Sequence, residues 1–231
     1  MERGRFIVLE GIDGSGKNTQ LSLITRELFD LNKGSDLKQT REPWKSEYGR
    51  MIRQILKSDR DPREKGEDCF DLYVKDRTLH LQMIEQELAQ GNIVISDRYY
   101  YSTIAYQQAQ GIELERIIEA NKVFPVPDLT MVFKIPPEKA LRRISKNRSK
   151  KEKFEELAFL TQVAYYFENM RSFTDRLDKA REIVDPDYKK ETLLFVNADQ
   201  APTKVYSEIR RCLEYQTIMQ EIQQIRARLN L

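Results

Sequence analysis

The chain has 231 residues, a length that predicts one domain or two. Its 39 lysines and arginines against 37 acidic residues leave a formal charge of +2, so no overall charge indicates a nucleic-acid or acidic-membrane partner. Hydrophobic residues make up 40% and charged residues of both signs 33%, a balance that argues against disorder.

Short β-branched runs alternate with amphipathic stretches along the whole chain. The predicted strands are Phe6–Glu10, Leu37–Thr40, Ile93–Ser96, Leu129–Ile135 and Leu193–Asn197. Helical patterns lie near 17–32, 46–57, 68–90, 100–121, 138–147, 152–181 and 202–229. Apolar strands joined by crossovers longer than about ten residues indicate a parallel α/β sheet with helices on both faces. We therefore predict one domain over residues 1–231, built on a five-stranded parallel sheet.

Two segments carry further patterns. The stretch 142–153 is rich in Arg and Lys, which indicates either a solvated helix end or a basic flap over a polyanion. The segment 202–229 places apolar residues at helical spacing, which predicts an amphipathic helix used in core or dimer packing. These apolar residues include Val205, Ile209, Cys212, Met219 and Ile222.

Several classes of protein do not fit the sequence. The apolar runs, such as Phe6–Leu9, are far shorter than the roughly 20 residues that span a bilayer. The first residues lead directly into a strand pattern, so we expect no signal peptide. Cys69 and Cys212 are widely separated, which argues against a zinc site or a disulfide framework and favours a cytoplasmic protein. His80 is the only histidine, so carboxylates, arginines and lysines must carry any catalysis.

Residues 6–20 combine a strand, a glycine-rich turn and the start of a helix. The turn reads Gly11-x-x-x-x-Gly16-Lys17. Glycines let backbone N–H groups converge on phosphate oxygens, the helix N-terminus adds the positive end of its dipole, and the lysine reaches the outer phosphates. This pattern predicts a phosphate-binding loop of the P-loop type. The residues expected at the bound phosphates are Gly11, Ile12, Asp13, Gly14, Ser15, Gly16, Lys17, Asn18 and Thr19.

The residue after Lys17 departs from the usual P-loop pattern. Ser or Thr normally binds Mg²⁺ there through a hydroxyl, and this chain has Asn18. An amide oxygen is also a hard ligand, and it can serve Mg²⁺ directly or through water. Asp97 closes an apolar strand, where P-loop enzymes hold the carboxylate that orders Mg²⁺ and its waters. We therefore expect a Mg²⁺ site at Asn18 and Asp97.

Three further segments narrow the prediction. Thr40–Pro43 reads TREP, Leu72–Arg77 reads LYVKDR, and Asp97–Gln107 reads DRYYYSTIAYQ. Together with EGIDGSGK at Glu10–Lys17, in this order and spacing, they closely resemble the thymidylate kinase family over about residues 5–210. The resemblance implies the nucleoside monophosphate kinase branch of the P-loop NTPase fold, with a five-stranded parallel sheet, a basic lid and usually a homodimer.

The resemblance also implies catalytic roles. Arg98 matches the arginine that clamps the acceptor phosphate, and Asp13 matches an acid of the loop that helps position it; taken alone, Asp13 is equally a turn residue. The basic stretch 142–153 occupies the lid position, where arginines stabilise charge on the transferring phosphoryl group. Spacing does not choose among its three arginines, Arg142, Arg143 and Arg148.

Recognition of the acceptor base is implied by residues on two helical patterns. Tyr73 and Arg77 are four residues apart and share a helix face. In the family, an aromatic side chain at the first position stacks on thymine and an arginine at the second hydrogen-bonds a base carbonyl. Thr103 and Gln107 match positions that read the base edge, and Tyr106 matches the residue that favours deoxyribose.

Other positions match the family around the acceptor. Arg41 and Glu42 belong to its Arg-Glu-Pro motif, and Arg53 matches an arginine that reaches the acceptor nucleotide in bacterial relatives. Trp44-Lys45 replaces a Gly-Gly of many bacterial members. The segment 197–202 occupies the position that holds adenine. The expected substrate-binding residues are Arg41, Glu42, Arg53, Tyr73, Arg77, Arg98, Ser102, Thr103, Tyr106 and Gln107.

The activity implied is transfer of the ATP γ-phosphoryl group to dTMP with Mg²⁺, giving dTDP and ADP. Such a transfer needs in-line positioning and charge neutralisation and no covalent intermediate. Two alternatives remain open at this point: a nucleotide kinase with another acceptor base, and a nucleotide-binding regulatory protein with impaired turnover, for which Asn18 is the only hint. We expect no membrane or nucleic-acid partner.

Overall fold

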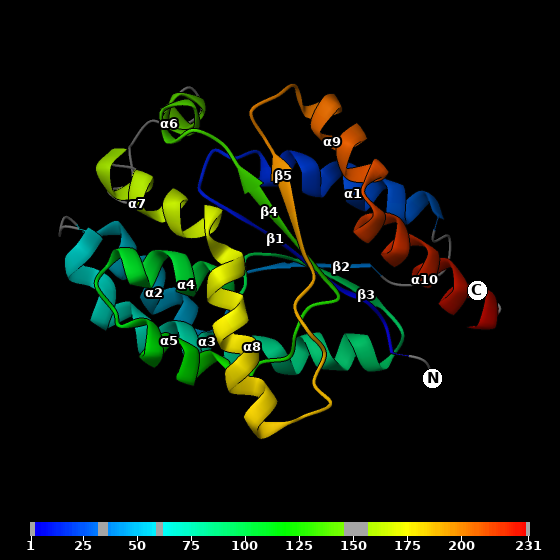
Figure 1. Cartoon of the computed structure of the whole chain (residues 1–231), viewed down its shortest axis with the longest axis horizontal. Coiled ribbons are helices and arrows are strands. Elements are labelled where there is room, and N and C mark those ends of the chain that lie inside the picture. The colour runs from blue at the N-terminus through cyan, green and yellow to red at the C-terminus, as the bar shows by residue number, and fades with distance from the viewer. Residues whose placement is uncertain (1–2, 32–36, 59–61, 146–156, 230–231) are drawn as a thin grey trace.

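Five parallel strands form the central sheet of the computed structural model, which describes residues 3–31, 37–58, 62–145 and 157–229 (Figure 1). The strand order is β2-β3-β1-β4-β5. The strands are β1 (Phe6–Gly11), β2 (Leu37–Arg41), β3 (Ile93–Asp97), β4 (Leu129–Lys134) and β5 (Leu193–Asn197). Each strand end lies within one residue of its predicted position. Because all strands run the same way, their carboxyl ends share one edge of the sheet.

Helices cover both faces of this sheet. The helices are α1 (Lys17–Leu31), α2 (Glu47–Lys57), α3 (Gly66–Ala89), α4 (Tyr100–Ala109), α5 (Leu114–Asn121), α6 (Pro137–Ser145), α7 (Leu157–Glu168), α8 (Met170–Val184), α9 (Pro202–Arg211) and α10 (Leu213–Leu229), with a 3₁₀ turn, η1, at Pro62–Lys65. Figure 1 shows α1, α9 and α10 grouped on one side of the sheet and α2–α5, α7 and α8 on the other. The α/β fold with a parallel sheet is confirmed.

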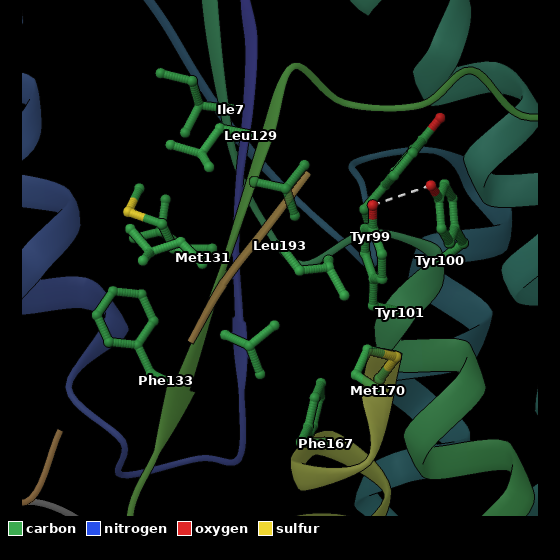
Figure 2. Close-up of a cluster of buried hydrophobic side chains, with 14 of the residues drawn as sticks. Ile7, Tyr99, Tyr100, Tyr101, Leu129, Met131, Phe133, Phe167, Met170 and Leu193 are labelled. Carbon is green, nitrogen blue, oxygen red and sulfur yellow. Dashed lines mark hydrogen bonds between the residues drawn. The ribbon is translucent and has the colours of Figure 1, made fainter. Parts of the chain in front are cut away.

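The core lies along the three central strands. β1 and β3 are buried at every residue and β4 at all but its last, because helices cover both of their faces. Figure 2 shows buried side chains on both faces of the sheet, with Ile7 and Leu129 on one face and Tyr99–Tyr101 and Met170 on the other, where α4 and α8 lie. Tyr99, Tyr100 and Tyr101 are fully buried, so this run packs in the core.

Three of the predicted helices are each broken in two. The expected helix 100–121 is interrupted after Ala109, because Gly111 adopts a left-handed φ of 90°. The expected helix 152–181, whose residues 152–156 lie outside the described ranges, is divided by Asn169 into α7 and α8. The N–H and the side-chain amide of Asn169 both donate to Tyr165 O. The expected helix 202–229 breaks at Cys212, whose backbone is extended with ψ 137°.

The C-terminal helices pack on the core. Tyr215, Ile218, Met219 and Ile222 of α10 are buried, which confirms the prediction of core packing for this segment. Glu27 of α1 accepts hydrogen bonds from the hydroxyls of Tyr206 (2.7 Å) and Tyr215 (2.6 Å). This carboxylate therefore joins the helix that follows the glycine-rich turn to both α9 and α10.

In the described ranges, no helix combines the length and apolar character needed to cross a membrane.

Candidate active site

A pocket of about 370 Å³ lies at the carboxyl edge of the sheet, with Asp13 of the glycine-rich turn in its wall. The ends of β1, β2 and β3 and the start of α4 meet here. All the residues expected to bind the acceptor line this pocket: Arg41, Glu42, Arg53, Tyr73, Arg77, Arg98, Ser102, Thr103, Tyr106 and Gln107. The sequence analysis missed three residues of the lining, which are Pro43, Leu56 and Lys57. The fold thus brings motifs that are far apart in the sequence together at the ends of three neighbouring strands, β2, β3 and β1.

The glycine-rich turn joins β1 to α1. Gly14 has a φ of 78°, and a Cβ at this position would lie 2.5 Å from the Ala140 carbonyl oxygen of α6. Only glycine fits both the backbone conformation and this close approach. The Lys17 ammonium donates to Gly11 O (2.8 Å) and Ile12 O (3.1 Å). Burial, followed by the nearby Arg98, lowers the pKa of Lys17 to about 8.

Two buried polar atoms near this turn have no hydrogen-bond partner within the described residues. They are Ser15 Oγ and Asp97 Oδ1. The other Asp97 oxygen lies 3.6 Å from Arg41 Nη2. Leaving such atoms unpaired costs free energy unless a ligand supplies the partner. Asn18 and Thr19 are exposed on the first turn of α1, and no cluster of three His, Cys, Asp or Glu side chains suited to a metal exists in the described segments.

Arg98 occupies a strained turn between β3 and α4. Its φ is 80°, in the left-handed region that residues other than glycine seldom adopt. Its guanidinium donates to Asp13 Oδ1 (2.8 Å), Ser102 Oγ (2.9 Å) and Tyr106 Oη (3.3 Å). The side chain is therefore held against the glycine-rich turn, where an anion shared by both segments can be bound.

Arg77 is completely buried and is held by three side chains. It pairs with Glu42 through Nε (3.0 Å) and Nη2 (2.7 Å). Nη2 also donates to Thr103 Oγ1 (2.9 Å), and Nη1 donates to Asn121 Oδ1 (2.6 Å). Burial disfavours the ionised form of Glu42, but Arg77 and His80 together outweigh it and lower the pKa of this carboxyl. The two residues therefore form a buried ion pair in the pocket wall.

Other predicted residues line the pocket while bonding to their neighbours. Arg53 Nη1 donates to Pro43 O (2.9 Å) and Trp44 O (3.0 Å), so it ties α2 to the segment after β2. The peptide bond between Glu42 and Pro43 is cis. Gln107 donates to Gln110 Oε1 (3.0 Å). Tyr73 lies in the wall beside these groups.

The basic stretch is only partly described. Arg142 and Arg143 belong to α6, and Arg142 is exposed. Arg143 reaches Gly14 O (3.4 Å) and Ala198 O (3.2 Å), which connects the glycine-rich turn to the segment after β5. Arg148 and the remainder of the stretch to 153 lie outside the described residues. Of the two described arginines, Arg143 is thus in contact with the glycine-rich turn.

Comparisons with known proteins agree with this geometry. A family model described as thymidylate kinase matches residues 9–185. The chain is 37% identical to a thymidylate kinase of Desulfotalea psychrophila over 169 residues, covering 72% of this chain and 82% of the relative. It is 35% identical to a probable thymidylate kinase of Archaeoglobus fulgidus over 211 residues, which covers 90% and 94% of the two chains. The chain belongs to the thymidylate kinase family.

Sequence analysis of this thymidylate kinase family member missed the buried carboxylate Glu10. It accepts hydrogen bonds from the Tyr99 N–H (2.7 Å), the Ser102 N–H (3.1 Å) and the Ser102 hydroxyl (2.7 Å). Burial raises the pKa of Glu10 to about 7, although the Arg98 charge opposes the rise. Glu10 therefore caps the first turn of α4 from a neighbouring strand and supports Ser102, which in turn accepts from Arg98.

Two further supports of the pocket were missed as well. His80 lies between Thr40 Oγ1 (2.6 Å) and Glu42 Oε1 (3.2 Å) and stacks on Trp44, with ring centroids 5.4 Å apart. Asp76 accepts from the Trp44 N–H (2.6 Å). The only sequence signal for His80 and Asp76 was that both lie near Arg77 on the same predicted helix. Trp44, in the position of a family glycine, is thus fixed by residues of α3.

Proposed function

We propose that the protein transfers the γ-phosphoryl group of ATP to dTMP, forming dTDP and ADP. The observation that carries this proposal is the pocket between the glycine-rich turn and the buried Arg77. One end holds Arg98, whose guanidinium suits a phosphate and is positioned by Asp13, and the other holds Arg77 and Thr103, which suit the polar edge of a base. The activity in the names of the relatives is the same.

On the donor side, the residues of the glycine-rich turn would hold the ATP phosphates. Backbone N–H groups of 14–18 and the N-terminus of α1 supply donors and a positive dipole. Lys17 now donates to two carbonyl oxygens and would exchange them for phosphate oxygens. Arg143, already bridging Gly14 and Ala198, would add positive charge beside the phosphates. Arg142 and Arg148 are the further lid arginines of the proposal.

Mg²⁺ fits this site, because the buried Asp97 Oδ1 has no hydrogen-bond partner among the described residues and a carboxylate oxygen is a hard ligand. Asp97 would hold the ion, with the Asn18 amide of α1 as the second candidate ligand. When bound, Mg²⁺ supplies charge neutralisation on the transferred phosphates. Ser15 Oγ, which is also buried and unpartnered in the described structure, would bond a phosphate oxygen.

On the acceptor side, Arg98 would clamp the dTMP phosphate while Asp13 keeps the guanidinium turned towards the glycine-rich turn. Arg41 and Arg53 of the pocket wall add positive charge along the same path. Such fixed donors act mainly by positioning the two substrates in line and by stabilising charge in the transition state. Ser102 supports Arg98 in this role.

At the base end, Tyr73 would stack on thymine while Arg77, Thr103 and Gln107 present hydrogen-bonding groups to its edge. Tyr106 Oη lies 3.3 Å from Arg98 and would occupy the space beside the sugar, which favours deoxyribose. Glu42 faces the same pocket, and its carboxylate is already committed to Arg77 and His80. We therefore assign Glu42 to orienting Arg77.

The proposal includes a homodimer in the cytoplasm, as the family implies. Sedimentation velocity should give a particle of twice the 27.4 kDa chain mass. A species of single-chain mass at micromolar concentration would contradict the dimer but would not bear on the proposed reaction.

An ADP-release assay tests the reaction. With ATP and Mg²⁺, release should require dTMP and should disappear in Lys17→Ala, because the lysine neutralises the outer phosphates. The exposed Lys75→Ala on α3 serves as the control and should retain the activity. Release of ADP without any acceptor, or none with every monophosphate, would contradict a thymidylate kinase.

A further inference from the structure

Asn121 is a buried side chain behind the base end of the pocket, and it belongs to none of the sequence motifs described above. It is the last residue of α5, it is 0% exposed, and it lies outside the pocket lining. Its side-chain amide donates to Ile117 O (2.7 Å). This bond fixes the amide group so that its carbonyl oxygen must face Arg77.

The Arg77 guanidinium has five N–H groups, and four of them have acceptors. Nε–H goes to Glu42, the two of Nη2 go to Glu42 and Thr103, and one of Nη1 goes to Asn121. In the described part of the chain, the second N–H of Nη1 is the one without an acceptor. Arg77 is completely buried but belongs to the pocket lining, and we assign this N–H to the ligand.

We propose that Asn121 is a specificity-determining positioning residue, which pins the Arg77 guanidinium so that it offers the base one N–H and no acceptor. The inference rests on the proposed function. A carbonyl oxygen, as in thymine, can pair with that N–H, whereas the exocyclic amino group of cytosine presents a second donor. Rejecting a base in this way requires that the guanidinium not turn and that no water bridge it.

Asn121 acts on the edge of the guanidinium that Glu42 does not hold. Glu42 and its partner His80 fix the Nε side. Without the Asn121 carbonyl, the N–H of Nη1 that it holds loses its acceptor, and the space left by the side chain admits water. Water can donate or accept a hydrogen bond, so the pocket would discriminate less between thymine and cytosine.

Asn121→Ala, compared with the unmutated enzyme on dTMP and dCMP, tests the inference. We expect kcat/KM for dTMP to fall on the order of tenfold, mainly through KM, since an aligned charged hydrogen bond is lost. The value for dCMP should stay unchanged or rise, and KM for ATP should not move. The ratio of the two kcat/KM values should therefore fall about tenfold or more.

Two further variants separate specificity from stability. Asn121→Asp keeps an oxygen towards Arg77 and should restore most of the selectivity. Asn92→Ala removes another buried asparagine, which donates to Glu87 Oε2 (2.9 Å) at the start of β3, and should leave the ratio unchanged. If Asn121→Ala does not fold, the Asp variant with its selectivity lost would by itself overturn the inference.

Contrary results are distinguishable. An equal fall for both bases in Asn121→Ala would show a merely structural role and overturn the inference, and so would an unchanged ratio. An unmutated enzyme that uses dCMP as well as dTMP would instead contradict the proposed function, and the inference with it.

Discussion

Two arginine side chains of the pocket are each paired with a carboxylate before any substrate binds. Arg98 has Asp13, and Arg77 has Glu42. Such pairs hold long, flexible side chains in fixed positions and so reduce the entropy lost when the substrates are bound. Several hydrogen bonds, including the one that the Ser96 hydroxyl donates to Arg98 O, offset the free-energy cost of the strained Arg98 backbone.

Removing the Arg98 guanidinium should separate transfer from donor binding. Arg98→Ala should lower kcat/KM for dTMP on the order of 10³-fold, because it removes a charged donor aimed at the acceptor phosphate. Calorimetric affinity for a non-hydrolysable ATP analogue should change less than about threefold. Arginine and alanine both carry a Cβ, so the left-handed backbone at position 98 costs about the same free energy in the variant as in the unmutated protein. The exposed Arg50→Ala is the control, and near-normal kcat/KM in Arg98→Ala would refute the assignment.

Glu10 should give the folded protein a specific pH dependence. Its pKa rises from 4.5 to about 7 on folding, so the folded state binds the proton more tightly than the unfolded state. This contribution to stability is complete below about pH 4.5 and is lost as the pH rises through 7. Between pH 5 and pH 8 the unmutated protein should lose on the order of 3 kcal/mol relative to Glu10→Gln. Urea unfolding at both pH values measures this, and parallel pH curves would disprove the titration.

At the scale of elements, the strands were predictable because each is a short apolar run between polar segments. The breaks within the helices were harder to predict from the sequence. Gly111 carries a sequence signal, but the break at Cys212 depends on how α10 turns to pack on the core. Glu10, His80 and Asn121 were missed because the pocket residues that they bond lie 38 to 92 residues away in the sequence and meet them only in the fold. The motifs predicted the pocket lining, but not the side chains behind it.

The junction of α1 with α9 and α10 depends on one carboxylate. Glu27 accepts from Tyr206 and Tyr215 and pairs with Arg210 Nε (2.8 Å), and Tyr215 is almost fully buried. Glu27→Ala should lower the free energy of unfolding by about 2–3 kcal/mol, because a buried hydroxyl loses its acceptor.

Urea denaturation measures this loss, with Glu85→Ala on the exposed side of α3 as the control, expected within about 0.5 kcal/mol of the unmutated protein. A loss for Glu27→Ala no larger than that of the control would show that the carboxylate does not hold the C-terminal helices in place.

For the whole molecule, the parallel sheet brings the phosphate loop, the Arg98 turn and the Arg77 ion pair to one edge. The account holds that this edge binds ATP and a thymine nucleotide together. The direct test is a panel of dTMP, dUMP, dCMP, dAMP and dGMP with ATP and Mg²⁺, followed by ADP release. dTMP should have the highest kcat/KM, exceeding that of dCMP on the order of 100-fold or more. Equal use of dTMP and dCMP, or a preference for a purine, would contradict the account.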